Sequence, residues 1–364
     1  MERGLKVLLA APTDKITLGV IGQYCKKALL DMGHEVEVFD FRKRPYGQGR
    51  LLSLVRSAAK RVMSFPVSLY EIPILKPLVD HSVNRRLLEL AANYRPDLLL
   101  VLFGENISPE TVLKIKDRFG ATTVNWMHDT LLLPPCLDLL KATYSCYDHI
   151  FIVDSGESPK KFGLVRDNIH TLPLACEPSV HKRLDLSKEE IEKYGSDVSF
   201  LGTMIPRREK ILESIGDMDL RIWGRWSKKS PTLERCYREQ DVYGAQAVKV
   251  YNASKIVLDI HGLYGEEEEI FNVTPRVFEV PASGGFLLTN YIPQLEEFYK
   301  VGEEIAAYKN LEEMRELLQY YLSHDEERQK MAEQGFRRAR AEHTYLSRMK
   351  RLLLTIEKGR SCAT

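Results

Sequence analysis

The chain has 364 residues, of which 44% are hydrophobic and 28% charged, and its formal net charge at pH 7 is +1. This composition is typical of a globular protein and excludes collagenous, coiled-coil and largely disordered chains. The length exceeds that at which a single hydrophobic core stops growing, so two domains are expected. The near-zero net charge gives no overall field that would favour nucleic acid as a partner.

The first apolar run of the chain stops at Pro12 and Asp14, which is too short for the core of a signal peptide. No uncharged run approaches the roughly 18 residues that a membrane-spanning helix needs. The six cysteines are scattered, and none forms a Cys-x-x-Cys pair typical of zinc or thioredoxin-type sites. We therefore expect a cytoplasmic protein with reduced thiols.

The N-terminal half alternates between buried strands and helices. Lys6–Ala11 is a continuous apolar run, as in strands buried on both faces of a parallel sheet. Helical spacing follows over Gly22–Met32, Gly33 suits a C-cap, and Glu35–Phe39 alternates as a strand. Further strands are predicted at Leu98–Phe103, Val124–Met127 and His149–Val153, and helices at Pro109–Arg118 and Leu137–Tyr144. This alternation predicts a doubly wound parallel sheet.

A polar stretch follows residue 178, and after it strands and helices alternate again. The later strands are predicted at Val198–Leu201, Leu220–Trp223, Ile256–Ile260 and Phe286–Thr289, and the tail Asn310–Lys358 is predicted to be helical. The sequence therefore predicts an α/β fold of two Rossmann-like domains facing a cleft. Their expected bounds are 1–178 and 179–345, with a C-terminal helix over 346–364 that packs back on the first domain.

Ligands of open α/β sheets bind beyond the carboxyl ends of the strands, so polar residues that follow strands are the candidate site. Gly202 and Thr203 follow the strand VSFL, and Arg207 and Arg208 come next, near the start of a helix at Pro206. A glycine permits close approach of a phosphate, and an arginine can bind it through two hydrogen bonds. The alternative is an ordinary helix start with surface arginines.

A second cluster lies between Asn272 and Thr289. Arg276 and Glu279 are one helical turn apart, so both can face one ligand: the arginine suits a diphosphate and the carboxylate a ribose diol. Gly284 follows as the cap of this helix. The alternative is a surface salt bridge and an ordinary C-cap.

These residues resemble the CgeB-like family of glycosyltransferases, which are predicted two-domain enzymes of GT-B architecture. The resemblance runs in order over about residues 98–350. Its motifs are NWMHDT (125–130), LPLACEPSVH (172–181), VSFLGT (198–203), LDIHG (258–262), RVFEVPASGGFLLTN (276–290) and EHTYLSRM (342–349).

The resemblance implies a hexosyltransferase-type enzyme of the EC 2.4 class that moves a sugar from a UDP- or dTDP-sugar to a hydroxyl acceptor. Arg276 with Arg207 or Arg208 would bind the diphosphate and Glu279 the ribose, in a site that also includes Gly202, Thr203, Asn272 and Gly284. Basic groups replace a metal in stabilising the leaving group, so neither a metal nor a permanently bound cofactor is expected.

The sequence departs from the family pattern at one position. Many retaining enzymes of this fold carry a Glu-x7-Glu pair that ends at the ribose-binding glutamate, and here the earlier position is Phe271. Whether the reaction retains or inverts the anomeric configuration therefore stays open. Asp217-Met218-Asp219 has the form of a metal-binding D-x-D, but its place before a buried strand indicates a turn.

Three residues are candidates for catalysis. His261, which follows the strand IVLDI, can bind the sugar or a phosphate oxygen, or cap a loop. His128 and Asp129 follow the strand from Val124, and either can accept the proton of the acceptor hydroxyl. Alternatively, His128 orients the acceptor and Asp129 caps a helix. Glu105 and Asp154, each after a strand, are further candidates.

Residues 42–62 hold seven basic residues and no acidic one. They form either a surface helix or a patch that docks at the inner face of the membrane or on an acidic acceptor. The acceptor is a glycan, a protein or a lipid-linked sugar, and not nucleic acid, because no aromatic stacking motif accompanies the charge.

The sequence leaves two alternative functions. The first is an inactive nucleotide-sugar-binding scaffold or regulator of the same fold. The second is a dinucleotide-dependent dehydrogenase, which the loop AAPTDKITLG disfavours because it lacks G-x-G-x-x-G.

Overall fold

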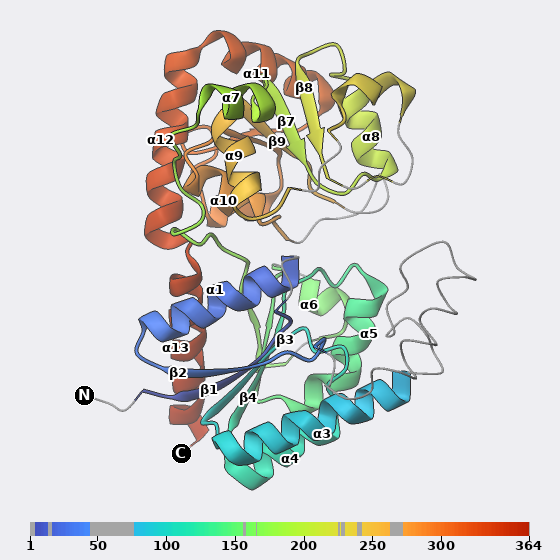
Figure 1. The fold of residues 1–364 in the computed structure, drawn as a ribbon, viewed down its shortest axis with the longest axis vertical. Coiled ribbons are helices and arrows are strands. Elements are labelled where there is room, and N and C mark those ends of the chain that lie inside the picture. Colours follow the sequence, from blue (N-terminus) through green and yellow to red (C-terminus); the bar gives the residue numbers. More distant parts are fainter. Residues whose placement is uncertain are drawn as a thin grey trace. The chain divides into compact units, whose positions relative to one another are not determined.

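The structure is a computed structural model that describes residues 4–13, 17–43, 76–155, 158–164, 166–224, 226, 230–238, 242–262 and 272–363. The chain divides into two compact units (Figure 1). Unit 1 comprises Met1–Ile152 and Phe162–Thr171, and unit 2 comprises Val153–Lys161 and Leu172–Thr364.

Unit 1 is built on a six-stranded sheet of order β2-β1-β3-β4-β5-β6, in which every neighbouring pair is parallel. Its strands are β1 (Lys6–Ala10), β2 (Glu35–Phe39), β3 (Leu98–Leu102), β4 (Thr122–Met127), β5 (His149–Ile152) and β6 (Ile169–Thr171). The helices are α1 (Thr17–Asp31), α3 (Lys76–Tyr94), α4 (Pro109–Phe119) and α5 (Pro134–Thr143). The predicted doubly wound parallel sheet is confirmed.

Local sequence signals set the ends of α4. Ser108 accepts a hydrogen bond from the backbone N–H of Thr111, Pro109 occupies the first turn, and Gly120 ends the helix with φ at 68°. Ser108 is thus the N-cap, and Gly120 is a left-handed C-cap. Proline suits the first turn because the N–H that it lacks would have no partner there. The helix packs Val112 and Ile115 into the core of unit 1.

Unit 2 is built on a second parallel sheet, of order β11-β10-β9-β7-β8. Its strands are β7 (Val198–Leu201), β8 (Leu220–Trp223), β9 (Ile256–Asp259), β10 (Leu287–Asn290) and β11 (Ala306–Tyr308). Its helices include α6 (Ser158–Lys161), α7 (Lys188–Tyr194), α8 (Pro206–Glu213), α9 (Ala245–Ala253) and α10 (Arg276–Ala282).

Both faces of the second sheet carry a hydrophobic core, as the continuous apolar strands predict. Along β9, Val257 belongs to one cluster of buried residues, whereas Ile256 and Leu258 belong to the other. Successive side chains of a strand point to opposite faces, so one strand serves both cores.

The predicted helical tail is confirmed. It consists of α11 (Leu311–Ser323), α12 (Asp325–Glu342) and α13 (Tyr345–Ala363). Where α12 ends, Cys176 donates its backbone N–H to the carbonyl of His343 and accepts from the N–H of Tyr345. The segment after Leu172, where the chain enters unit 2 for the second time, is thus bonded to the junction of the last two helices.

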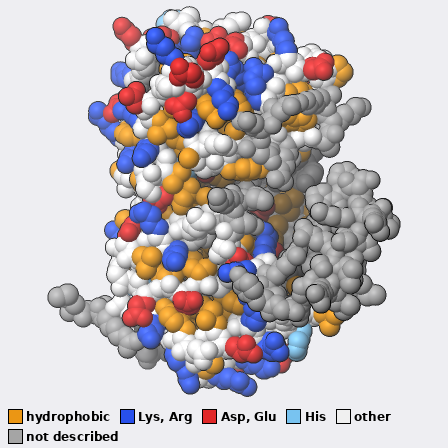
Figure 2. All heavy atoms as spheres, in the orientation of Figure 1, with side chains coloured by type: hydrophobic (Ala, Val, Ile, Leu, Met, Phe, Trp, Pro, Cys, Tyr) orange, Lys and Arg blue, Asp and Glu red, His pale blue; other side chains and the backbone are white. Residues whose placement is uncertain are grey.

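The hypothesis of a membrane-docking segment at residues 42–62 falls almost wholly outside the described residues. Within the described part, no helix combines the length and the apolar character needed to cross a bilayer. On the surface shown in Figure 2, acidic and basic side chains are interspersed, in keeping with the net charge of +1.

The two sheets share one winding pattern. In each, the first strand of the unit lies between its second and third strands, so the strand order reverses between β1 and β3 and between β7 and β9. Ligands of such sheets bind at this reversal, beyond the carboxyl ends of the strands. The residues that follow β7 and β9 are therefore expected to share one site, although 54 residues of chain separate the two strands.

A close approach of two backbones shapes this end of the second sheet. Gly224 follows β8 with φ at 128°, and a Cβ atom built on it would lie 2.3 Å from the carbonyl oxygen of Gly202. Gly202 in turn donates its N–H to the carbonyl of Trp223. The glycine after β8 is thus required by contact as well as by conformation.

Replacing Gly224 with alanine should destabilise the protein by about 1–3 kcal/mol more than Gly33→Ala. Gly33 also has a positive φ, 83°, but a Cβ there would meet nothing within 4 Å, so that variant pays only the backbone strain. Denaturant unfolding of both variants provides the measurement. Equal losses would show that the contact with Gly202 is readily relieved.

Candidate active site

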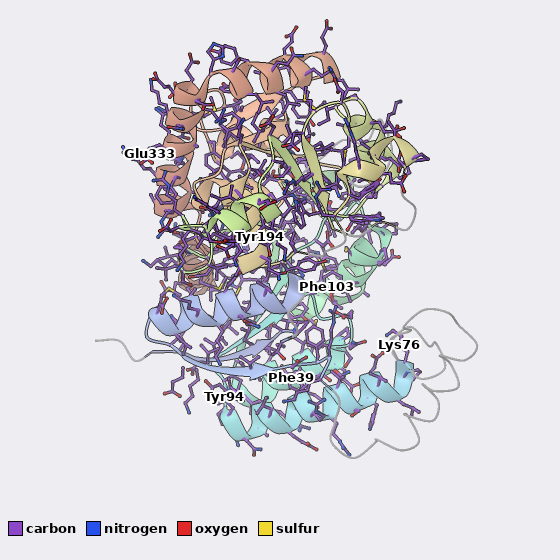
Figure 3. The ribbon with its side chains drawn as sticks, turned by 45° about the horizontal axis from the view of Figure 1, so that its top comes forward. Phe39, Lys76, Tyr94, Phe103, Tyr194 and Glu333 are labelled. Carbon is purple, nitrogen blue, oxygen red and sulfur yellow. The ribbon has the colours of Figure 1, made fainter. Side chains whose placement is uncertain are left out.

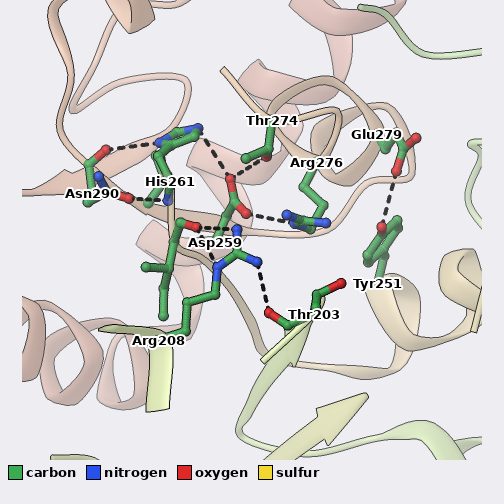
Figure 4. A network of polar contacts seen from close by, with 11 residues as sticks. Thr203, Arg208, Tyr251, Asp259, His261, Thr274, Arg276, Glu279 and Asn290 are labelled. Atoms are coloured by element: carbon green, nitrogen blue, oxygen red, sulfur yellow. Dashed lines mark hydrogen bonds and ion pairs between the residues drawn. The ribbon is translucent and has the colours of Figure 1, made fainter. Parts of the chain in front are cut away.

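A cluster of charged and polar side chains lies at the carboxyl ends of β7 and β9 (Figure 4). It contains Arg208 from α8, Asp259 from the end of β9, His261 just beyond it and Arg276 from the start of α10. Two of the predicted clusters, around Arg208 and around Arg276, therefore meet at the reversal of strand order.

Arg208 joins the loops that follow the two central strands. Its Nε and Nη2 donate to the carbonyl of Ile260 at 3.2 and 3.0 Å, and its Nη1 donates to the carbonyl of Thr203 at 2.9 Å. The side chain is buried, with 4% of its surface exposed. Two of its five N–H donors remain without a partner among the described residues, so the guanidinium can bind an anion while holding both loops.

Asp259 is the centre of the cluster. One of its oxygens accepts from Nε of Arg276 at 2.6 Å and the other from the hydroxyl of Thr274 at 2.5 Å. The carboxylate has no exposed surface, whereas 17% of the Arg276 side chain is exposed. The two terminal nitrogens of Arg276 make no hydrogen bond within the described part of the chain. The ion pair therefore fixes Arg276 by its inner nitrogen and leaves its outer edge for a ligand.

The charge state of Asp259 follows from these neighbours. Burial alone would raise its pKa, but Arg276, His261 and the hydroxyl of Thr274 together lower it from 3.8 to about 2. The carboxylate is thus ionised at neutral pH. Asp259 is not among the residues predicted from the sequence, although a charged residue inside the apolar run IVLDI is a signal of a buried functional carboxylate.

Three arginines crowd the same end of the sheet. Burial, together with the nearby positive charges of Arg276 and Arg207, lowers the pKa of Arg208 to about 10, although Asp259 opposes that change. Arg208 is still protonated at neutral pH, and the mutual repulsion of the cations is relieved when an anion binds. Arg207, adjacent on α8, is half-buried.

His261 lies beneath this cluster. Its ring is fully buried, with Nε2 at 3.3 Å from Asp259 and Nδ1 at 3.2 Å from the hydroxyl of Thr289. Its backbone N–H donates to the side chain of Asn290 at 2.6 Å. Burial lowers the pKa of His261 against the attraction of Asp259, so the ring is neutral at pH 7. The sequence predicts that His261 binds the ligand or caps a loop, and the structure places its buried ring against Asp259.

Glu279 follows one helical turn after Arg276, and the structure brings the two side chains to the same region (Figure 4). One oxygen of Glu279 accepts from the hydroxyl of Tyr251 at 3.2 Å, and the other faces Nε2 of His181 at 3.7 Å. The Glu279 side chain keeps 22% of its surface exposed. Sequence reasoning identified neither Tyr251 nor His181 as a partner of Glu279.

The remaining predicted residues of this set lie at differing distances from the cluster. Thr203 is exposed and contributes its carbonyl to Arg208. Asn272 is half-buried in the coil before α10. Gly284 caps the far end of α10, where a Cβ would strike the side chain of Arg183, so it lies apart from Arg276. The predicted turn at Asp217 is held by an exposed ion pair with Arg315.

A second group of candidates lies in unit 1, at the carboxyl ends of β3 and β4. Phe103, at the end of β3 (Figure 3), has φ at 66°, which is rare for a bulky residue. Its ring lies 5.6 Å from that of His128. Strained backbone of this kind is often found at functional sites, because the surrounding structure must sustain it.

His128 and Asp129 differ in their surroundings. The ring of His128 is buried, and its Nε2 has no hydrogen-bond partner among the described residues. Burial lowers the pKa of His128 to about 4, with a smaller contribution from Arg42. Asp129 is solvent-accessible, and partial loss of water around its carboxyl raises its pKa.

The other two candidates of the sequence analysis are also placed. Glu105 accepts from Nε and Nη2 of Arg42 at 2.9 and 2.7 Å, so it is held in an ion pair. Asp154 is fully buried. The described residues contain no group of three His, Cys, Asp or Glu side chains placed to hold a metal ion.

Known proteins resemble this chain in sequence and in fold. Residues 207–354 match the family model described as glycosyl transferase-like. The chain is 22% identical over 275 residues to spore protein CgeB of Bacillus subtilis (strain 168). The alignment covers 71% of this chain and 82% of that protein.

Solved structures share the fold over nearly the whole chain. Sucrose-phosphate synthase from Thermosynechococcus elongatus superposes with a TM-score of 0.68 at 10% identity, covering 97% of this chain and 99% of that one. Anabaena Alr3699/HepE in complex with UDP and glucose superposes with a TM-score of 0.62 at 12% identity, covering 97% and 100%. The likeness identifies the fold as GT-B.

Replacing Asp259 with asparagine should lower the free energy of unfolding at neutral pH by about 2 kcal/mol. This is the free energy that corresponds to the lowering of the Asp259 pKa from 3.8 to about 2 on folding. Because the pKa is lowered on folding, this stabilisation is complete above pH ~4 and is lost as the pH falls toward ~2. The difference between wild type and Asp259→Asn should therefore shrink near pH 3.

Urea unfolding at both pH values measures this difference. The control is Asp217→Asn, which removes an exposed ion pair and should change stability little. A difference for Asp259→Asn that is independent of pH would contradict the charge state assigned to the pair.

Proposed function

We propose that this chain, a glycosyltransferase of GT-B fold whose residues 207–354 form the glycosyl transferase-like domain, moves a sugar from a nucleoside diphosphate sugar to an acceptor hydroxyl. The chain is a homologue of spore protein CgeB. The donor is proposed to be UDP- or dTDP-linked, which the UDP complex of the HepE structure supports by analogy of fold.

One observation carries the proposal: Arg208 and Arg276 converge where the strand order of the second sheet reverses. Arg208 binds the loops after both central strands, and Asp259 holds Arg276 with its outer edge unbonded among the described residues. Arg208 and Arg276 are both positively charged, and Asp259 balances only one of them. A diphosphate supplies the negative charge that balances the rest. Guanidinium groups fixed in advance bind it without first having to reorganise.

Glu279 is proposed to bind the ribose of the donor. A carboxylate offers about four acceptor positions, of which Tyr251 takes one and His181 faces another. The two that remain match the two hydroxyl donors of a ribose diol. Arg276 and Glu279, one helical turn apart on α10, would thus bind adjoining parts of one nucleotide.

In the transfer step, the bond between the anomeric carbon and the diphosphate oxygen breaks, and the bond to the acceptor oxygen forms. Negative charge grows on the departing diphosphate, where Arg208 and Arg276 stabilise it electrostatically. These cations supply the charge that a divalent metal supplies in other transferases, so the reaction is proposed to need no metal.

The acceptor hydroxyl must lose a proton during transfer, and Asp129 is proposed to accept it. Its carboxyl is accessible, and its raised pKa brings it nearer to the pH at which a general base works best. His128 is proposed to orient the acceptor through Nε2, its nitrogen without a partner among the described residues. His261 is proposed to support Asp259 from behind rather than to touch the sugar.

Replacing Arg276 with alanine should weaken binding of uridine diphosphate by roughly 10- to 100-fold, because a charge-assisted hydrogen bond is lost. Turnover of the sugar donor should fall as well. Calorimetry measures the affinity, and the control is Arg337→Ala, an exposed arginine whose partner is Glu333 on α12 (Figure 3).

Unfolding of both arginine variants is followed in parallel, because removal of Arg276 leaves Asp259 without its cation. Wild-type affinity in a folded Arg276→Ala protein would refute the phosphate role. Tight nucleotide binding by the wild type, with no hydrolysis or transfer from a panel of nucleotide sugars, would favour the inactive scaffold instead.

Treatment with a metal chelator should leave the transfer rate unchanged, because arginines rather than a metal stabilise the leaving diphosphate. The rate is measured with a nucleotide sugar that the panel identifies as a donor, before and after chelation. Loss of activity that added magnesium restores would contradict the metal-independent mechanism.

A further inference from the structure

We propose that Tyr251 and His181 are positioning residues that fix the Glu279 carboxylate so that it reads the hydroxyls of the donor ribose. The inference rests on the proposed role of Glu279. It assigns selectivity for ribose to two residues that need not touch the nucleotide, and it arises from contacts between chain segments that are far apart in the sequence.

The two residues approach Glu279 from different elements and address different oxygens. The Tyr251 hydroxyl, on α9, donates to Oε2 at 3.2 Å. Nε2 of His181, in the segment that precedes α7, lies 3.7 Å from Oε1. Both side chains are almost completely buried, at 3% and 2% exposure, so neither can readily turn away.

The hydrogen bonding of His181 fixes its tautomer. Its Nδ1 accepts the backbone N–H of Glu177 at 2.9 Å, so the proton of the neutral ring lies on Nε2. That N–H then points toward the carboxylate of Glu279. At 3.7 Å the contact is longer than a hydrogen bond, and it acts as an oriented dipole facing a charge.

A compact turn holds the His181 ring in place. The backbone N–H groups of Val180 and His181 both donate to the carbonyl of Glu177. The side chain of Glu177 accepts from the N–H and the hydroxyl of Ser179. The preceding residue, Cys176, is bonded to the backbone at the end of α12. The ring is therefore preorganised by its support.

Both groups keep the proton that makes them donors. Burial, together with the negative charge of Glu279, raises the pKa of Tyr251 well above 10, so its hydroxyl stays protonated. Burial lowers the pKa of His181, although Glu279 and Glu177 oppose that change, so the ring is neutral at pH 7. Glu279 therefore faces two neutral donors, which direct it without cancelling its charge.

The consequence concerns selectivity rather than affinity alone. A carboxylate on a flexible side chain can rotate. Rotation moves its lone pairs out of line with the hydroxyls of a bound diol and weakens the hydrogen bonds between them. The hydrogen bond from Tyr251 to one oxygen and the N–H dipole of His181 facing the other oppose that rotation. Each oxygen keeps an acceptor position for a ribose hydroxyl. Without them, Glu279 would still attract hydroxyls but would discriminate less between nucleotides with and without the diol.

The test compares two probes by calorimetry: uridine diphosphate and 2′,3′-dideoxyuridine diphosphate. The ratio of their dissociation constants reports the ribose contact, whereas a general structural defect would weaken both equally. The wild type should prefer the diol by roughly tenfold or more, as expected for hydrogen bonds to a charged group. Glu279→Gln should bring the ratio close to one.

Tyr251→Phe removes one hydroxyl and should lower the ratio at least severalfold. Its matched control is Tyr320→Phe, which removes a hydroxyl that is bonded to Glu327 on the exposed surface of the same unit. For His181, asparagine keeps an acceptor for the N–H of Glu177, and glutamine keeps a donor toward Glu279. His181→Asn should therefore lower the ratio, and His181→Gln should largely restore it.

The outcomes separate the inference from the proposed function. If the wild type does not distinguish the two probes, or Glu279→Gln leaves the ratio unchanged, Glu279 does not bind the ribose and both proposals fall. If Glu279→Gln abolishes the preference but Tyr251→Phe and His181→Asn retain it, the positioning role alone is overturned. Equal ratios for His181→Asn and His181→Gln would also overturn the role of His181. Tyr251→Phe provides the decisive result if the histidine variants do not fold.

Discussion

A buried ion pair, Asp259 with Arg276, is the interaction on which the proposed site depends. A carboxylate without exposed surface is costly unless it is paired and hydrogen-bonded, and Asp259 meets that condition through Arg276, Thr274 and the nearby His261. The pair ties the start of α10 to the end of β9. It thereby sets where both Arg276 and Glu279 are presented, since they occupy one short helix.

The parallel sheet supplies the place where this pair acts. Because all strands of unit 2 run in one direction, their carboxyl ends gather residues that the sequence keeps far apart. At the reversal of strand order, Arg208 links the loops after β7 and β9 by donating hydrogen bonds to both. Gly224, which follows β8 at the same end of the sheet, permits the backbone of Gly202 to approach closely. At this end of the sheet, residues of the proposed site also hold neighbouring loops together.

The two units divide the proposed chemistry. Unit 2 holds Arg208 and Arg276 by hydrogen bonds at one end of its sheet, as stabilisation of a leaving diphosphate requires. Unit 1 presents a different set, in which Asp129 is accessible and has a raised pKa, whereas His128 is buried beside the strained Phe103. The proposed supports of Glu279 add a layer behind the ligand-binding residues, and such layers commonly hold binding groups within the narrow range of productive geometry.

The sequence by itself determined the parallel α/β class, the helical tail and the strands β2, β7 and β8 to the residue, because apolar runs and caps are local signals. It missed β6 and β11, which are three-residue edge strands too short for a pattern. It placed Arg276 and Glu279 on one helical face but overlooked Asp259, Tyr251 and His181. Only the tertiary structure decided those partners and buried His261, because the cost of burying a polar group depends on neighbours that long-range packing supplies.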